Sequence, residues 1–167
     1  MTDDPRWFIA NATEATWRAA PGWGRSVRFE PERTRFQDYG INLHTIEPGE
    51  RSTMYHGEDG QEDFLVVSGS CLAIVEGEER TLRAWDLLHC PAWTRHTFFN
   101  DGDEPCTMVM VGARRGGEEV DCVYPVEPLA QRRGAGVDAE TTSPDVAYAG
   151  TPETQDMPYV RGTLPGA

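Results

Sequence analysis

The stretch from Leu82 to Asn100 reads LRAWDLLHCPAWTRHTFFN, and its pattern is typical of β-structure. Short apolar runs alternate with polar residues, and Pro91 interrupts the pattern. The turn sequence Asn-Asp-Gly-Asp follows at residues 100–103. We therefore expect one strand over Leu82–Cys90 and a second over His96–Phe99.

The same pattern continues on both sides of this stretch. Four more strands are predicted, at Ile41–Ile46, Phe64–Val67, Cys71–Val75 and Met108–Val111. Turn residues separate them, including Glu-Pro-Gly-Glu at 47–50 and Ser-Gly at 68–69. Six strands at intervals of roughly 8–12 residues indicate a sandwich or a barrel.

Composition divides the chain into three parts. Residues 1–40 are expected to form an N-terminal extension that packs on the barrel, residues 41–115 the barrel, and residues 116–167 a short helix and an extended arm. The expected elements of the flanks are strands at Trp7–Ala10 and Val27–Phe29, a helical turn near Asn11–Ala20 and a helix at Val126–Arg133. The arm is rich in Gly, Pro, Thr and acidic residues, and we expect it to wrap a neighbour or to fray.

The charge of the chain excludes several classes of function. Among 167 residues, 15 are basic and 28 acidic, for a net charge of −13, and every basic residue is arginine. Without lysine there is no Schiff-base, pyridoxal-phosphate or P-loop chemistry. The acidic balance argues against nucleic acid and anionic membranes as partners. The N-terminus is acidic, unlike a signal peptide, so we predict a cytoplasmic protein.

The four cysteines are predicted to be small buried hydrophobic residues. They are Cys71, Cys90, Cys106 and Cys122, and no C-x-x-C pair occurs among them. A zinc site built from thiolates is therefore not expected.

A second stretch, residues 48–69, reads PGERSTMYHGEDGQEDFLVVSG and carries candidate metal ligands. Strand alternation would place Glu62 on the same face as Phe64. With residues 82–100, this stretch resembles the two motifs of the cupin family, G…H-x-H…E…G and G-D…P…H-x-x-x-N. The resemblance runs from Ile41 to Ala113; Glu62 stands seven residues before Gly69, as in the family.

The second cupin motif is the better preserved. Pro91, His96 and Asn100 keep its spacing, and Asp86 matches the acid of its Gly-Asp turn. We expect His96 to be a metal ligand and Asn100 to stabilise a turn.

The resemblance implies an all-β, cupin-like jelly-roll β-barrel with a metal ion near one mouth. The implied ligands are His56, Glu62 and His96, two imidazoles and a carboxylate that suit Fe(II) best and also accept Mn, Ni or Zn. The expected function is a metal-dependent enzyme of oxygenase, lyase or isomerase type acting on a small oxygenated molecule. The alternative is a barrel that binds a small ligand without turnover. Family members commonly pair, so a homodimer is expected.

The first motif departs from the family, because H-x-H is not intact. His56 can occupy its first position with Glu58 in the second, or its second position with Met54 in the first. Without any shift, Tyr55 and Gly57 occupy the two positions and His56 lies between them. A shift of one residue reverses the faces of a strand, so whether Glu58 or Met54 completes the metal shell stays open.

Other residues carry weaker expectations. Trp85 and Trp93 stand where the family usually has glycines and would crowd the turns near the barrel mouth. Arg51 and Tyr55 are candidates for orienting an anionic substrate. His89 is interpreted as structural, and so is His44, with general acid or base chemistry as its functional alternative.

Overall fold

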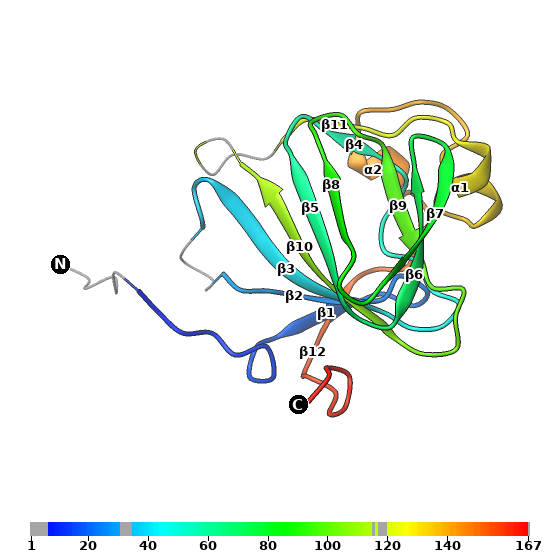
Figure 1. Ribbon diagram of the computed structural model, residues 1–167. Helices are drawn as coiled ribbons and strands as arrows, with labels where there is room; N and C mark the ends of the chain where they lie inside the picture. Colours follow the sequence, from blue (N-terminus) through cyan, green and yellow to red (C-terminus); the bar gives the residue numbers. More distant parts are fainter. Residues whose placement is uncertain (1–6, 31–34, 115, 117–119, 167) are drawn as a thin grey trace.

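A seven-stranded antiparallel sheet and a three-stranded antiparallel sheet face one another in the computed structural model, which describes residues 7–30, 35–114, 116 and 120–166 (Figure 1). The large sheet has the order β12-β1-β2-β3-β10-β5-β8, the small one β7-β6-β9, and β11 pairs with β4 separately. The strands are β1 Trp17–Ala19, β2 Arg25–Arg28, β3 Tyr39–Ile46, β4 Gly57–Glu58, β5 Glu62–Ser68, β6 Ser70–Val75, β7 Glu78–Arg83, β8 Leu87–Cys90, β9 His96–Phe99, β10 Cys106–Ala113, β11 Cys122–Val123 and β12 Gln155–Met157.

The main core fills the space between the two sheets. Phe64 and Val66 of β5 point into it together with Met108 of β10, and Ala73 and Phe98 meet them from the small sheet. Fully burying such a side chain stabilises the fold by roughly 1.5–3 kcal/mol relative to leaving it exposed. The barrel expected from the series of short apolar runs and turns is therefore confirmed.

The single strand expected over Leu82–Cys90 is wrong, because two strands of different sheets share this stretch. β7 ends at Arg83 and β8 begins at Leu87. Between them, Asp86 accepts a hydrogen bond from the Arg83 backbone N–H at 2.9 Å, and Trp85 takes a left-handed φ of 77°. β7 has the sequence EERTLR and is almost entirely exposed. Its sequence therefore shows no alternation of apolar and polar residues from which a strand could be predicted.

The N-terminal flank differs from its prediction. Residues 7–10 form no strand, and the expected helical region holds a turn followed by strand β1. Trp17 explains β1: its side chain is fully buried, and its indole N–H donates to the Ala12 carbonyl at 2.8 Å. The strand expected at Val27–Phe29 exists as β2, Arg25–Arg28.

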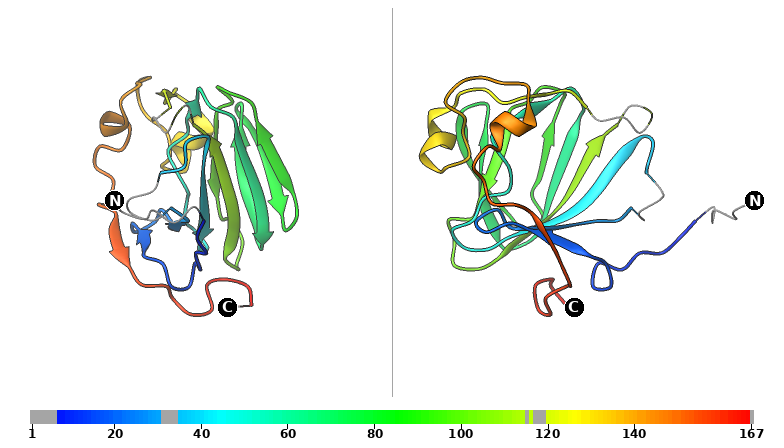
Figure 2. Two further views of the ribbon diagram at one scale, coloured as in Figure 1. Left: turned by 90° about the vertical axis from the view of Figure 1, so that its left-hand side faces the viewer. Right: turned by 180° about the vertical axis from the view of Figure 1, so that it is seen from behind.

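The C-terminal flank packs against the barrel. The predicted helix near residue 130 is confirmed as α1, Pro128–Arg132, and a second helix, α2, covers Pro144–Ala147. The arm then runs across the outside of the barrel to β12, which pairs with β1 (Figure 2). Small side chains take part in this packing, and Ala135, for example, is completely buried. In the described part of the chain, no helix is long and apolar enough to cross a membrane.

Candidate metal centre

Two histidines meet on neighbouring strand segments. His56 precedes β4 and His96 begins β9, and their backbones exchange both hydrogen bonds of an antiparallel pair, with N···O distances of 3.2 and 2.8 Å. Directly opposed residues present their side chains on the same face. The two imidazole rings accordingly lie 4.9 Å apart, centroid to centroid. Both are buried, His56 to 7% exposure and His96 to 1%.

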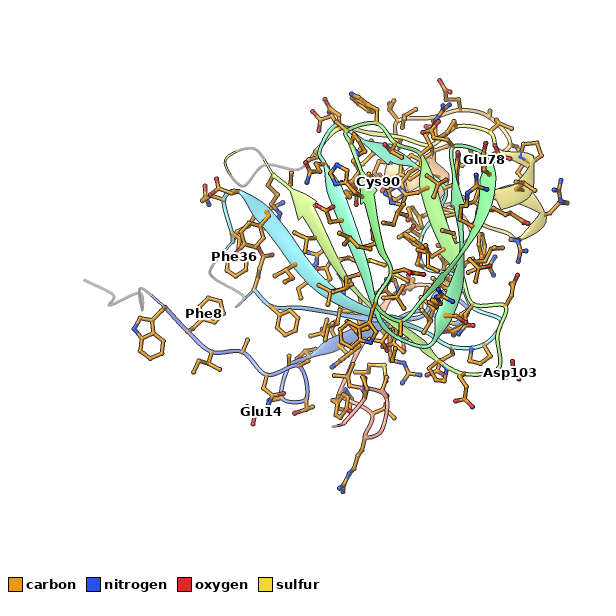
Figure 3. The ribbon with its side chains drawn as sticks, viewed as in Figure 1. Phe8, Glu14, Phe36, Glu78, Cys90 and Asp103 are labelled. Atoms are coloured by element: carbon orange, nitrogen blue, oxygen red, sulfur yellow. The ribbon has the colours of Figure 1, made fainter. Side chains whose placement is uncertain are left out.

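Glu62 reaches the same point from the large sheet. It begins β5, opposite Cys90 of β8, and Figure 3 labels Cys90 toward the upper end of the barrel. A Glu62 carboxylate oxygen lies 3.4 Å from Nε2 of His96. His56, Glu62 and His96 each offer one ligand atom, and these three atoms lie within 4.8 Å of one another. The structure thus brings together the three residues that the motifs single out, while metal binding by them stays a prediction.

Backbone carbonyls set the orientation of both imidazoles. Nδ1 of His56 lies 2.7 Å from the Met54 carbonyl oxygen, and Nδ1 of His96 lies 3.0 Å from that of Thr94. A carbonyl only accepts, so each Nδ1 carries a hydrogen and each neutral ring leaves Nε2 as a bare acceptor. These Nε2 atoms face carboxylates, an arrangement that a cation between them stabilises. Metal-binding histidines are commonly held in this way, so the donor set fits a divalent ion.

Burial and neighbouring charge set the protonation of the cluster. Burial, reinforced by the nearby His56, lowers the pKa of His96 to about 3, so this ring is neutral at neutral pH. Burial also opposes protonation of His56, but Glu58 and Glu62 outweigh it and raise the His56 pKa above its usual value. Burial and the charge of Glu58 raise the pKa of Glu62. A divalent ion would therefore compete with a proton held in this cluster.

Of the two residues that could complete the first motif beside His56, the structure places Glu58 at the candidate ligands and Met54 away from them. Glu58 follows His56 by two residues in extended chain, its carboxylate lies 3.5 Å from Nε2 of His56, and both residues line the same cavity. The Met54 side chain instead packs with Tyr124 and Val137 in a separate apolar cluster. This placement matches the alignment with His56 in the first histidine position and Glu58 in the second.

A cavity of about 290 Å³ opens over the three candidate ligands. Phe64 forms part of its wall, with its ring centroid 4.7 Å from that of His96. Three arginines, Arg28, Arg35 and Arg114, also line it. Sequence reasoning missed these arginines, because their approach to the cavity depends on strand register.

One signal in the sequence does point to Arg114. Gly40 and Gly112 lie opposite each other within β3 and β10, and glycines inside strands often mark a close approach. A Cβ atom on Gly40 would come within 2.6 Å of the Arg114 guanidinium. Arg114 is held there by an ion pair with Glu30 and by a hydrogen bond to the Phe36 carbonyl.

Four residues with functional expectations lie elsewhere. Trp85 and Trp93 do not crowd the mouth: they are 76% and 49% exposed, and neither is among the described residues lining the cavity. Both adopt left-handed φ values, 77° and 69°, which explains the glycines usual at these positions. Arg51 and Tyr55 are also absent from that lining: Arg51 donates to the Arg133 and Gly134 carbonyls, and the Tyr55 hydroxyl accepts from the Gly77 N–H.

The remaining predicted residues have structural surroundings. Asn100 is completely buried and donates to the Ile46 and Glu104 carbonyls, both at 2.8 Å, which confirms its role in a turn. His89 lies on the surface, 2.7 Å from Asp63. His44 is buried, and its Nε2 lies 3.2 Å from the Trp23 carbonyl oxygen.

Residues 42–112 match the cupin domain family. A 5-nitrosalicylic acid 1,2-dioxygenase from Bradyrhizobium sp is 32% identical over 66 residues, which cover 40% of this chain and 31% of that protein. The chain spans less than a third of the length of the curated relatives that it matches.

Solved structures resemble the fold more broadly. A sugar phosphate isomerase of the cupin superfamily from Silicibacter pomeroyi has a TM-score of 0.53 at 24% identity, over 80% of this chain and 82% of that one. A polyketide cyclase from Streptomyces resistomycificus has a TM-score of 0.57 at 12% identity, over 67% of this chain and 82% of that one. At such identities the likeness shows the fold alone.

Proposed function

This chain belongs to the cupin superfamily, and we propose that it is a metal-dependent enzyme whose His56, Glu62 and His96 hold one divalent ion. The observation that carries the proposal is the pair of buried imidazoles whose Nδ1 atoms are bound to backbone carbonyls and whose Nε2 atoms face carboxylates, His56 that of Glu58 and His96 that of Glu62. Two imidazoles and one carboxylate leave coordination positions for a substrate. The substrate is a small oxygenated molecule.

Fe(II) is the ion we favour, because it suits two histidines and one carboxylate, and Mn, Ni or Zn also fit this donor set. A relative named as a dioxygenase, matched over 66 residues, supports a reaction of oxygenase type. When bound, the ion supplies Lewis-acid chemistry and, if it is iron, redox chemistry.

The chain itself positions the reactants. The Met54 and Thr94 carbonyls hold the rings of His56 and His96 in one tautomer. Phe64 and Phe98 exclude water from one side of the cavity. Glu58 lies beside His56 on the cavity wall, where its carboxylate can accept a proton from a bound substrate.

Calorimetric titration with Fe(II) under nitrogen, and with Mn(II), tests the proposal. The wild type should bind one ion per chain, and His96→Ala and Glu62→Gln should each weaken binding by at least about tenfold, in the range found when metal-site residues are altered. His89→Ala is the matched control, since its ring pairs with Asp63 outside the cavity. Wild type that binds no ion, or a His96→Ala variant that binds as the wild type does, would overturn the metal site.

Turnover is tested separately, with the iron-loaded protein in an oxygen electrode and a panel of hydroxybenzoates that includes 5-nitrosalicylate. Oxygen uptake that His96→Ala abolishes supports an oxygenase. The competing function is a non-catalytic binding module, favoured by Glu58 in place of the second histidine of the family motif. A panel member that binds the loaded protein and is recovered unchanged would favour the module.

A further inference from the structure

A second, larger cavity adjoins the first. Its volume is about 680 Å³, and Trp23, His44 and Tyr148 are among its walls. Four residues line both cavities: Arg28, Asn42, Thr53 and Met110. A ligand bound at the candidate metal centre can therefore extend past these residues into the second space.

Strand register arranges three of the shared residues in a row. Met110 lies opposite Phe64 on one side and Asn42 on the other, and Asn42 lies opposite Arg28. Opposed residues share a face, and neighbouring strands are about 4.8 Å apart, so Arg28 stands about 14 Å along the row from Phe64. The Phe64 ring is the one in contact with His96. The row of residues thus begins at Phe64, beside the candidate metal ligands, and ends at the positively charged side chain of Arg28.

The guanidinium of Arg28 is available to a ligand. Within the described residues it makes no hydrogen bond and no ion pair, and its charge acts on Glu30, which already pairs with Arg114. By contrast, Arg25 is paired with Glu47. In a chain with a net charge of −13, an arginine on the wall of two cavities marks a place suited to an anion.

The other groups of the second cavity are compatible with an anionic ligand. His44 is neutral, because burial lowers its pKa to about 4. Its Nε2–H donates to the Trp23 carbonyl, which leaves Nδ1 as an acceptor. The acidic residues on this wall are Glu30 and Asp156, and both are engaged, Glu30 by Arg114 and Asp156 by Arg18. The lining also includes the uncharged polar residues Asn42, Ser52 and Thr53.

We propose that the substrate is an elongated anion whose oxygenated head lies at the metal centre and whose carboxylate or phosphate group is bound by Arg28. Its body lies along Met110 and Asn42. The placement of the head rests on the proposed function, whereas the anion site at Arg28 does not require the metal. A planar guanidinium binds carboxylate and phosphate alike through two parallel hydrogen bonds.

A series of dicarboxylates, from malonate to suberate, tests the proposal by calorimetry on the Zn(II)-loaded protein. Affinity should pass through a maximum at the chain length that joins the centre to Arg28. Arg28→Gln should lower the maximal affinity by about tenfold, the effect expected for a charge-assisted hydrogen bond, and should flatten the dependence on length. Arg28→Lys keeps the charge and should recover part of the loss. Glutarate compared with 4-phosphonobutyrate distinguishes a carboxylate from a phosphate-like group.

Arg80→Gln is the control, because its replacement changes the net charge equally, while Arg80 lines neither cavity and pairs with Glu78 on β7. This control variant should bind the dicarboxylates with affinities within about twofold of the wild-type values, since the effects of distant surface charges are weak. The proposal is overturned if Arg28→Gln binds as the wild type does, if Arg80→Gln loses as much affinity as Arg28→Gln, or if the wild type binds no dicarboxylate at millimolar concentration.

Metal titration of Arg28→Gln separates this proposal from the proposed function. The variant should bind the ion with wild-type affinity, since Arg28 is not among the candidate ligands. If the wild type binds no ion, the metal-free protein still tests the anion site. Glutarate binding that Arg28→Gln weakens would then support the site at Arg28 while the metal proposal fails.

Discussion

Replacing His44 with glutamine should remove a large part of the acid sensitivity of the fold. The His44 ring is fully enclosed, and burial lowers its pKa from 6.5 to about 4. Between these two values the unfolded chain binds a proton at His44 and the folded chain does not. The free energy of unfolding therefore falls as the pH drops from about 6.5 to about 4. The difference in pKa corresponds to about 3 kcal/mol.

Urea unfolding at pH 7, 6, 5 and 4.5 measures this effect in the wild type and in His44→Gln. The glutamine amide can still donate to the Trp23 carbonyl, and it does not titrate. The destabilisation caused by the variant at pH 7 should therefore shrink steadily toward pH 4.5. His96 titrates in both proteins, so its contribution cancels in the comparison.

Ser52→Ala provides the control, because Ser52 lines the same cavity and does not titrate. Its stability should follow the wild-type pH dependence closely. If the curves for the wild type and His44→Gln stay parallel from pH 7 to 4.5, the burial of a neutral His44 is not the cause of acid sensitivity, and the reasoning is refuted.

Three further predictions concern stability and assembly. Asn100→Ala should lower the free energy of unfolding by about 2–4 kcal/mol, because it removes the side-chain donor to the buried Ile46 carbonyl. Denaturant titration measures this change, and a decrease below about 1 kcal/mol would contradict the prediction. Trp93→Gly should raise thermal stability slightly, by about 0.5–1 kcal/mol, since glycine relieves the left-handed φ of 69°; a lower melting temperature would count against it. We propose a homodimer that forms through edge strand β8, where Leu87 is 62% exposed. Light scattering should show a dimer that Leu87→Glu dissociates and that the control Val126→Glu leaves intact. A wild-type monomer would contradict this proposal.

Strands with one apolar face were predictable from sequence. β5 and β10 stand out in the chain as short apolar runs, Phe64–Val67 and Met108–Val111, and the structure buries alternate residues of them such as Phe64 and Met108. β7 was not predictable in this way, because its charged residues face solvent on both sides. The burial of residues in the C-terminal arm was also not predictable from sequence. Ala135 is completely buried, but a single alanine does not raise the hydropathy of the surrounding sequence.

The candidate site shows a similar division. His96 and Glu62 stand out because a motif fixes their spacing, and His56 was predicted as a ligand from its place in the first motif; the structure pairs His56 with His96 across neighbouring segments. The lining of the cavity depends instead on cross-strand register. Arg28 reaches the cavity through its alignment with Asn42, and residues so far apart in sequence carry no local sign of that alignment. Arg51 was a candidate for orienting an anionic substrate, but its side chain donates a hydrogen bond to the Gly134 carbonyl instead.

The most direct test of the metal centre is an anomalous difference map from a crystal grown with Mn(II) or Fe(II). We predict one strong peak per chain, with Nε2 of His56, Nε2 of His96 and a Glu62 carboxylate oxygen each about 2.0–2.3 Å away, as for similar ligands on other divalent ions. A fully occupied peak bound by surface carboxylates, with Glu62 and His96 remaining in direct contact, would contradict the account.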